Sequence, residues 1–354
     1  MLPLLAALAA YAASGGSETE VSAAVQKLVP TSVATPTPTP LPPTPTPTPL
    51  PTPTSTPHPP TPTPEPSPPA PAPPPLAATP QPTPAPVVCV RYLSWVWQFS
   101  VDGAAAEIAT VLADHDLGII LKTHKGVDWM AKEDSSADAV SGPEQVRKLA
   151  HYFESRGVPF HAYVVPTGVD PKAEAAMAAE VLAAGARSIF LDLEPWHGYW
   201  QGTPEDARVF GEELLRLQPD GVVITVVEPR PWALNKLPLA EFAAFSDALA
   251  PLIYWDTFNS GPNVKLYEDY GWPPGPAGIT PEFLLDVSTE LLQQYGLPLQ
   301  PVGQGASSSV DAWERFLNDA SQSGMRDISV WRYGVTNPAV PELLKERTAA
   351  GGTC

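Results

Sequence analysis

Short apolar runs recur along the chain from Val87 onward, and each is followed by a loop and then by an amphipathic stretch. Continuous apolar runs of this length are typical of parallel strands that are buried on both faces. They predict strands over 89–97, 117–123, 159–165, 188–194, 222–228, 250–256, 299–304 and 328–333.

Between these runs, apolar residues recur at helical spacing. Val146, Leu149, Ala150 and Phe153, for example, form one stripe on the surface of a helix. Glycines stand just beyond several of the stretches and mark their ends. The pattern predicts helices over 143–156, 172–184, 204–217, 281–295 and 310–320, and more weakly over 104–113, 239–249 and 341–347.

Eight repeats of strand and helix within residues 87–354 predict an α/β fold, the (β/α)₈ or TIM barrel, whose usual size is about 250 residues. An open doubly wound sheet is the main alternative. That fold carries a glycine-rich dinucleotide loop after its first strand, and no such loop is present here. The pattern therefore favours the barrel.

Two segments of different composition precede the barrel. Residues 1–16 contain an apolar stretch, too short to span a bilayer, and are expected to be a signal segment although a positive charge is missing. A disordered tail is the alternative. Residues 17–86 hold most of the 48 prolines, in Thr-Pro repeats that exclude helix and sheet, so a disordered Pro/Thr-rich linker is expected. Such tracts are typical of stalks in exported proteins.

The net charge of the chain limits the kinds of molecule that it is expected to bind. A net charge of −18 argues against nucleic acid as a partner, because binding it requires a basic face.

Cys89 and Cys354 lie near the two ends of the barrel, so a disulfide in an oxidising compartment is expected, with two unrelated thiols as the alternative. No spacing suggests a metal or another cofactor. We expect a secreted or cell-surface monomer, with the N-terminal segment as a point of attachment.

The strand over 188–194 carries the clearest candidate chemistry. The active site of a (β/α)₈ barrel lies at the carboxyl ends of its strands. Phe190, Asp192 and Glu194 are two apart, so they share one face and enter the barrel mouth together. Neighbouring negative charge and apolar surroundings favour a protonated carboxyl, as a general acid for glycosidic cleavage requires. The structural alternative is that Asp192 caps a segment or pairs with Lys122 or Arg332.

Aromatic residues gather at the same strand ends. Indole rings stack on the apolar faces of sugars, which predicts a glycan groove; the alternative is that the tryptophans fill the core, as expected for Trp313. A cationic sequence, Lys122 to Lys125, either binds an acidic sugar or, as we favour, neutralises the acidic mouth through Lys122 and His124. The predicted substrate-binding residues are Trp97, Lys122, Tyr163, Trp196, Trp232, Trp255, Gln304 and Trp331.

Three short motifs resemble those of glycoside hydrolases. The sequence ending in Asp192-Leu193-Glu194 resembles the fourth strand of the chitinase-like family 18 and, more weakly, of the lysozyme-like family 25. The segments 252–256 and 324–331 resemble the sixth and last strands of family 18. The resemblance implies that Glu194 protonates the leaving oxygen, that Asp192 orients a substrate acetamido group, and that Tyr254 donates a hydrogen bond to this group.

The chain departs from these families at several positions. Phe190 stands where family 18 has an earlier aspartate, and Trp255 separates Tyr254 from Asp256. The first strand also lacks the aspartate of family 25. A second mechanism is therefore kept open, in which Glu228 or Asp256 acts as a base about 6.5–9.5 Å from Glu194 in an inverting enzyme.

Taken together, these features predict an extracellular glycoside hydrolase that cleaves a polysaccharide. A cell-wall glycan or another polymer that contains N-acetylhexosamine is the candidate substrate. The alternative is a catalytically inactive carbohydrate-binding barrel displayed on a stalk, and a purely structural domain is a third reading that leaves the aromatic residues unexplained.

Overall fold

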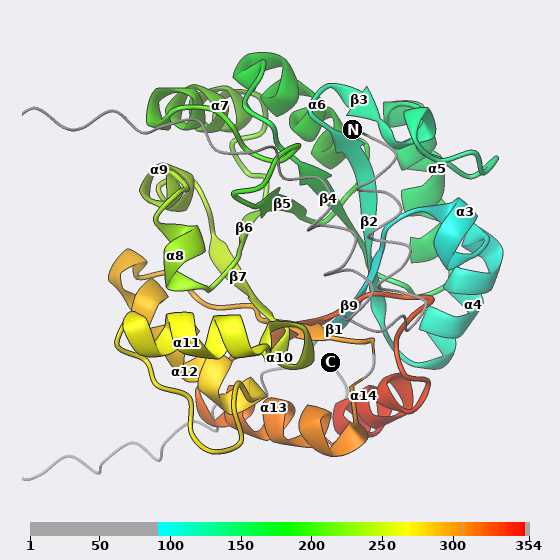
Figure 1. The fold of residues 1–354 in the computed structure, drawn as a ribbon. Coiled ribbons are helices and arrows are strands. Elements are labelled where there is room, and N and C mark those ends of the chain that lie inside the picture. The colour runs from blue at the N-terminus through cyan, green and yellow to red at the C-terminus, as the bar shows by residue number, and fades with distance from the viewer. Residues whose placement is uncertain (1–90, 307, 351–354) are drawn as a thin grey trace, which may run out of the picture. The chain divides into compact units, whose positions relative to one another are not determined.

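Parallel strands close into a barrel in the computed structural model, which describes residues 91–306 and 308–350 (Figure 1). The strands are β1 (Arg91–Val96), β2 (Gly118–Lys125), β4 (Phe160–Val165), β5 (Ile189–Leu193), β6 (Val223–Val227), β7 (Ala248–Ile253), β8 (Val302–Gln304) and β9 (Asp327–Trp331). β1 pairs with both β9 and β2, which closes the sheet. The two-residue β3 (Asp128–Trp129) returns antiparallel beside β2. The predicted (β/α)₈ barrel is confirmed.

Helices surround the barrel, as Figure 1 shows. The stripe predicted on α5 is buried against the strands, because the outward side chains of a barrel strand need an apolar partner. In chain order the helices are α3 (Phe99–Asp102), α4 (Ala105–Asp114), η1 (Met130–Lys132), α5 (Pro143–Glu154), α6 (Pro171–Ala183), α7 (Pro204–Leu217), α8 (Pro231–Leu234), α9 (Leu239–Ala243), α10 (Trp255–Phe258), α11 (Gly261–Asp269), α12 (Pro281–Leu292), η2 (Gln293–Tyr295), α13 (Val310–Gln322) and α14 (Ala339–Ala350).

Most predicted elements are present, but the helix over 239–249 and the strand over 250–256 were placed wrongly. α9 ends at Ala243, and β7 already begins at Ala248. The main-chain N–H of Asp247 donates to the carbonyl of Val223, and its carboxylate accepts from the N–H of Val223. These bonds hold the chain beside the start of β6, so β7 begins earlier than its sequence suggests. Trp255 and Asp256 consequently lie on α10 instead of in the strand.

Several sequence-based predictions concern residues outside the described ranges. These are the signal segment over 1–16, the linker over 17–86 and the pairing of Cys89 with Cys354. They remain predictions.

Four aromatic side chains fill the barrel interior, and we call them the interior aromatic cluster: Trp95, Tyr163, Phe190 and Trp331. The ring centroid of Trp95 lies 4.8 Å from that of Tyr163, 5.3 Å from that of Phe190 and 5.6 Å from that of Trp331. The indole N–H of Trp95 donates to the hydroxyl of Ser329 at 2.8 Å. Layers of interior side chains are usual in this fold, and here the layer is largely aromatic.

A cavity lies beneath this cluster, toward the amino ends of the strands. It measures about 180 Å³, and Phe190, His161 and Ser188 contribute to its lining. The Nδ1 atom of His161 lies 2.7 Å from the hydroxyl oxygen of Ser188. Phe190 thus separates this lower polar pocket from the upper end of the barrel.

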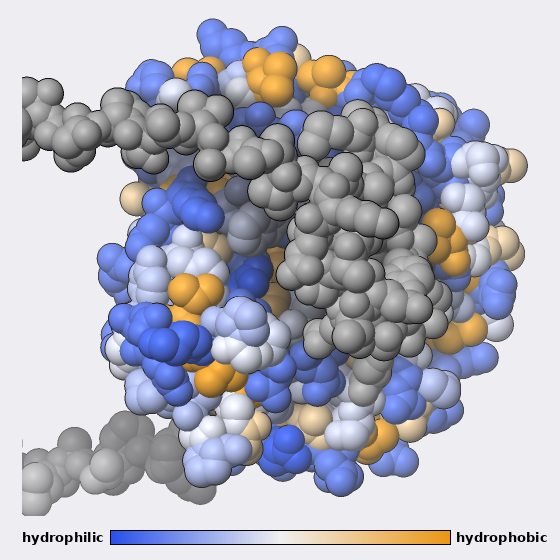
Figure 2. All heavy atoms as spheres, viewed as in Figure 1, coloured by the Kyte–Doolittle hydropathy of each residue, from blue (hydrophilic) through white to orange (hydrophobic). Residues whose placement is uncertain are grey.

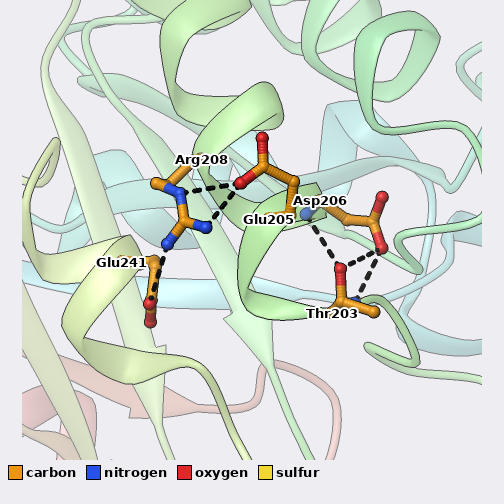
Figure 3. A network of polar contacts seen from close by, with 5 residues as sticks. All are labelled: Thr203, Glu205, Asp206, Arg208 and Glu241. Carbon is orange, nitrogen blue, oxygen red and sulfur yellow. Dashed lines mark hydrogen bonds and ion pairs between the residues drawn. The ribbon is translucent and has the colours of Figure 1, made fainter.

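The start of α7 is fixed by a reciprocal cap (Figure 3). The hydroxyl of Thr203 accepts from the N–H of Asp206 at 3.2 Å, and the carboxylate of Asp206 accepts from the N–H of Thr203 at 2.8 Å. Arg208 binds Glu205 on the same helix and Glu241 on α9 at 3.3 Å. A capping box satisfies amide groups that a helix end leaves unpaired, which explains why α7 begins where the sequence predicts.

We expect Thr203→Ala to lower the free energy of unfolding by about 1 kcal/mol, because it leaves the first amides of α7 without their acceptor. Chemical denaturation of the full chain measures this loss. Thr110→Ala is the matched control, since Thr110 lies on the exposed surface of α4 and bonds only the carbonyl of Ala106. Equal losses in both variants would contradict a role for the cap.

Candidate active site

β5 carries two carboxylates into the carboxyl end of the barrel. Ile189, Leu191 and Leu193 are fully buried on its outer face, where they meet the helices. Asp192 lies on the inner face, opposite Val226 in the register of β6, and Glu194 follows directly after the strand. The alternation of a strand therefore places both carboxyl groups at the barrel mouth.

These two carboxylates line a small cavity of about 100 Å³ above the interior aromatic cluster. Liquid water occupies about 30 Å³ per molecule, so the cavity has room for about three waters or one small substituent. Figure 2 shows the barrel face hollowed at its centre, with hydrophilic residues at depth. The lining residues are Trp95, Asp192, Glu194, Tyr199, Val226, Leu252, Tyr254 and Trp331.

Asp192 is buried, with only 7% of its surface exposed. Among the described residues, its carboxylate has neither an ion pair nor a hydrogen bond, so the structural alternative of a pair with Lys122 or Arg332 is absent there: Lys122 pairs with Glu133, and Arg332 with Asp102. Burial raises the pKa of Asp192 to about 7, although the charges of Lys122 and Lys125 act against the rise.

Glu194 has a pKa well above its ordinary value. Burial is the largest cause, and the negative charges of Asp192 and Glu228 add to it. Arg230 and a hydrogen bond from the side chain of Trp196 act in the opposite direction. Because the raising effects dominate, Glu194 keeps a proton to higher pH than an ordinary glutamate does.

Tyrosine hydroxyls face the same two carboxylates. Burial, followed by the charges of Asp192 and Glu194, raises the pKa of both Tyr199 and Tyr254. The pKa of Tyr163 is raised for the same reasons, and among the described residues its hydroxyl has no hydrogen-bond partner. These phenols therefore keep their protons, and Tyr199 and Tyr254, which line the cavity, can donate hydrogen bonds into it.

Lys122 and Lys125 provide positive charge on the β2 side of the mouth. The ammonium of Lys122 is buried and lies 3.1 Å from the carboxylate of Glu133, and that of Lys125 lies 5.7 Å from the ring centre of Tyr199. His124 does not contribute charge as expected, because burial and the nearby Lys122 lower its pKa to about 3. On this side of the mouth the lysines, and not His124, offset the charge of Asp192.

The two carboxylates considered as bases are both engaged elsewhere. Glu228 is buried and bound through both oxygens by the guanidinium of Arg230. Asp256 lies exposed on α10 and accepts from the amide of Gln304 at 3.5 Å and from the hydroxyl of Ser308 at 3.4 Å. Neither side chain lines the cavity. The side-chain amide of Gln304 also accepts from the N–H of Thr257 and donates to the carbonyl of Ala306.

The tryptophans predicted to bind sugar lie in four different environments. Trp331 lines the cavity, and Trp196 is exposed at the mouth beside Arg230. Trp97 and Trp232 are half-buried in the rim. Trp255, in contrast, is 3% exposed and packs on the rings of Trp313 and Phe316, so it belongs to the core.

Three lining or neighbouring residues were missed in the sequence. Tyr199 reaches the cavity from the loop after β5, and only the conformation of that loop brings it there. Trp95 shares the inner face of β1 with Leu93, a parity that the sequence does show. Arg230 stands two residues after Glu228. In an extended chain this spacing places both side chains on one face, so an ion pair between them could have been predicted.

Within residues 91–306 and 308–350, no group of three or more His, Cys, Asp or Glu side chains is arranged to hold a metal ion.

Comparisons with known proteins support the fold. No family model and no curated protein matches the chain. The C-terminal domain of a putative chitinase from Desulfitobacterium hafniense superposes with a TM-score of 0.51 and 12% identity, over 74% of this chain and 99% of that one.

Two further solved structures are similar to a lesser degree. They are a glycoside hydrolase family 18 N-acetylglucosaminidase from Paenibacillus barengoltzii (TM-score 0.49, 10% identity, 74% of this chain and 100% of that one) and the spore cortex-lytic enzyme SleL from Bacillus cereus (TM-score 0.48, 12% identity, 73% and 74%). At these identities the likeness shows the barrel fold alone, and the chemistry follows from the site.

We expect Asp192→Asn to stabilise the protein at alkaline pH. The unfolded chain loses the proton of Asp192 near the usual 3.8, whereas the folded protein holds it to about pH 7, so stability falls as the pH rises between these values. The variant lacks this loss and should be more stable at pH 8 by up to about 4 kcal/mol.

Denaturant unfolding from pH 3.5 to pH 8 measures this effect. The difference between the parent and Asp192→Asn should vanish at the acid end, where the aspartate is protonated in both states. Asp220→Asn, at an exposed position before β6, is the control and should leave the pH dependence of the parent in place. A constant difference across the range would contradict the burial of a titrating carboxyl.

Proposed function

We propose that the barrel hydrolyses glycosidic bonds of a polysaccharide, with Glu194 as the general acid. The observation that carries the proposal is the pair of carboxyls at the end of one strand, the buried Asp192 and the half-buried Glu194, in a cavity otherwise lined by aromatic and apolar side chains. A protonated carboxyl at the edge of such a cavity is the group that glycosidic cleavage requires.

Glu194 acts on the leaving group. Its raised pKa keeps the carboxyl neutral near pH 7, so it transfers a proton to the glycosidic oxygen as the bond from that oxygen to the anomeric carbon breaks. The departing sugar leaves as an alcohol, and Glu194 becomes a carboxylate. Arg230 and Trp196, the two groups that lower its pKa, stabilise the negative charge that forms.

The attacking group is an acetamido oxygen of the substrate itself. The cavity of about 100 Å³ admits one small substituent, and Asp192 and Tyr254 both line it. Tyr254 keeps its proton and donates to the substituent, while Asp192 accepts from the amide N–H and orients it. Water then opens the cyclic intermediate, with Glu194 taking a proton from that water.

This choice among mechanisms rests on where the other carboxylates lie. An inverting enzyme needs a free base across the cavity from its acid. Glu228 is bound by Arg230, and Asp256 lies on α10 outside the lining. The substrate-assisted course needs neither of them. The putative chitinase that superposes on this chain is named for a polymer of N-acetylhexosamine, which fits the same substrate class.

We place the activity outside the cell, as a secreted or surface-attached monomer. The apolar stretch within residues 1–16 and the Thr-Pro repeats of residues 17–86 support export and display on a stalk. Cell-wall and other extracellular glycans are the polymers available there. Among the helices of the described ranges, none is both long enough and apolar enough to span a bilayer.

We expect Glu194→Gln to lower the rate of glycan cleavage by about 10²–10⁴-fold, because the amide cannot donate a proton at neutral pH. The full chain and the variant are incubated with chitin oligomers, peptidoglycan, glucans and mannans, and new reducing ends are counted. Glu212→Gln, exposed on α7, is the matched control and should retain full activity. If no glycan is cleaved and one is bound tightly by parent and variant alike, the protein is a binding barrel instead of a hydrolase.

The pH profile gives an independent check of Glu194. Since Glu194 must be protonated, kcat/KM should fall on the alkaline side of its pKa. The charge of Glu228 raises that pKa, so Glu228→Gln should move the alkaline limb to lower pH, and the released Arg230 acts in the same direction. Glu212→Gln should leave the limb in place. A limb that stays unmoved in Glu228→Gln, with thermal unfolding showing an intact fold, would assign the acid to another residue.

A further inference from the structure

A groove lies on the outside of the barrel, between the α8–α9 segment and the end of α12. Its volume is about 440 Å³, within the range of about 300–1,000 Å³ that is typical of ligand sites. Leu234 and Leu239 line one wall, and Tyr270, Trp272 and Tyr295 line the other. Figure 1 shows α8 and α9 beside α11 and α12 on this side of the molecule.

A row of side chains connects this groove with the barrel mouth. The guanidinium of Arg230 lies 5.5 Å from the ring centre of Trp196 at the mouth and 5.9 Å from that of Trp232. The ring of Trp232 lies 5.8 Å from that of Tyr270, which lines the groove together with Trp272. Side-chain contacts thus link the groove to the site already described.

The row is exposed at both ends. Among the large hydrophobic side chains of the described ranges that reach the surface, the aromatic ones are Trp196, at 36% exposed, and Tyr270, at 43%. Exposed rings cost free energy in water unless a ligand covers them. Their placement at the mouth and at the groove marks the two ends of one binding surface.

The row is also held rigid from beneath. Tyr267 is fully buried, and its ring packs edge-on against Trp232 at 4.9 Å and against Phe283 at 5.0 Å. The indole N–H of Trp272 donates to the carboxylate of Glu290 at 3.2 Å. A surface whose rings are fixed in place loses little entropy when a ligand settles on it.

We propose that this groove binds a distal part of the same glycan chain that is cleaved at the mouth, an inference that rests on the proposed function. Flat aromatic faces bind the apolar faces of sugar rings, and the amides of Asn235 and Gln294 in the groove lining suit sugar hydroxyls. The chain passes from the cavity over Trp196 and Trp232 to Tyr270 and Trp272. The protein therefore prefers long glycans to short ones.

The test measures binding as a function of chain length. The full chain with Glu194→Gln, which prevents hydrolysis, is titrated with chitin oligomers of increasing length and with polymeric chitin, peptidoglycan and glucan. We expect Trp272→Ala, added to this protein, to weaken polymer binding about tenfold, with a loss that shrinks as the oligomer shortens. Trp272→Tyr keeps a ring in the groove and should recover most of the affinity.

Tyr152→Ala is the matched control, because Tyr152 is a half-buried aromatic on α5, away from the row. Three results would each contradict glycan binding in the groove. They are a loss of affinity that is equal at every oligomer length, no loss in Trp272→Ala, and no binding of any polymer by the protein. If the parent cleaves no glycan but binds glycans in a length-dependent way through Trp272, the proposed hydrolase activity would be contradicted and glycan binding in the groove would be supported. The two proposals therefore fail separately.

Discussion

The enclosure of two carboxyl groups at the end of β5 is the constraint around which the rest of the mouth is arranged. Asp192 and Glu194 occupy an apolar cavity, and isolated charges there would be costly, so the proton stays on the acid instead. Lys122 and Lys125 supply enough positive charge to limit this effect at Asp192, and Arg230 does so at Glu194. Opposing effects thereby act on the pKa of both carboxyls.

The loops that frame this mouth are tied together by polar side chains far apart in sequence. Asp102, after β1, binds Arg332 after β9, and the carboxylate of Asp134 accepts from the main chain of Phe99 and Ser100. Trp97 lies between two cations, 6.0 Å from the ammonium of Lys122 and 5.2 Å from the guanidinium of Arg332. These contacts fix the rim over the cavity, since buried charges need their partners in place.

Local signals explain which parts of this architecture were predictable. Both ends of the helix over 204–217 were predicted correctly. Its start was predictable because Thr203 and Pro204 mark it within the sequence itself. The inward direction of Asp192 and Glu194 follows from the period of a strand. The start of β7 did not follow, since it depends on bonds between Asp247 and Val223.

The site was predictable to a lesser extent. The sequence indicated the acidic pair, Tyr254 and Trp331, which the structure brings into one cavity. The engagement of Glu228 and Asp256, and the approach of Tyr199, depend on how loops fold back over the strands. The charge state of His124 was equally unpredictable. The sequence suggests a cation at this position, but complete burial beside Lys122 keeps the imidazole neutral.

Phe190 also separates the barrel interior into an upper and a lower compartment. Its ring stands between the upper carboxyls and the lower pocket that holds His161 and Ser188, and it offers no atom that can pass a proton. The N–H of Trp95 at the same level is committed to Ser329. Phe190 therefore places a ring that cannot carry a proton between the lower pocket and the two carboxyls, which face the mouth.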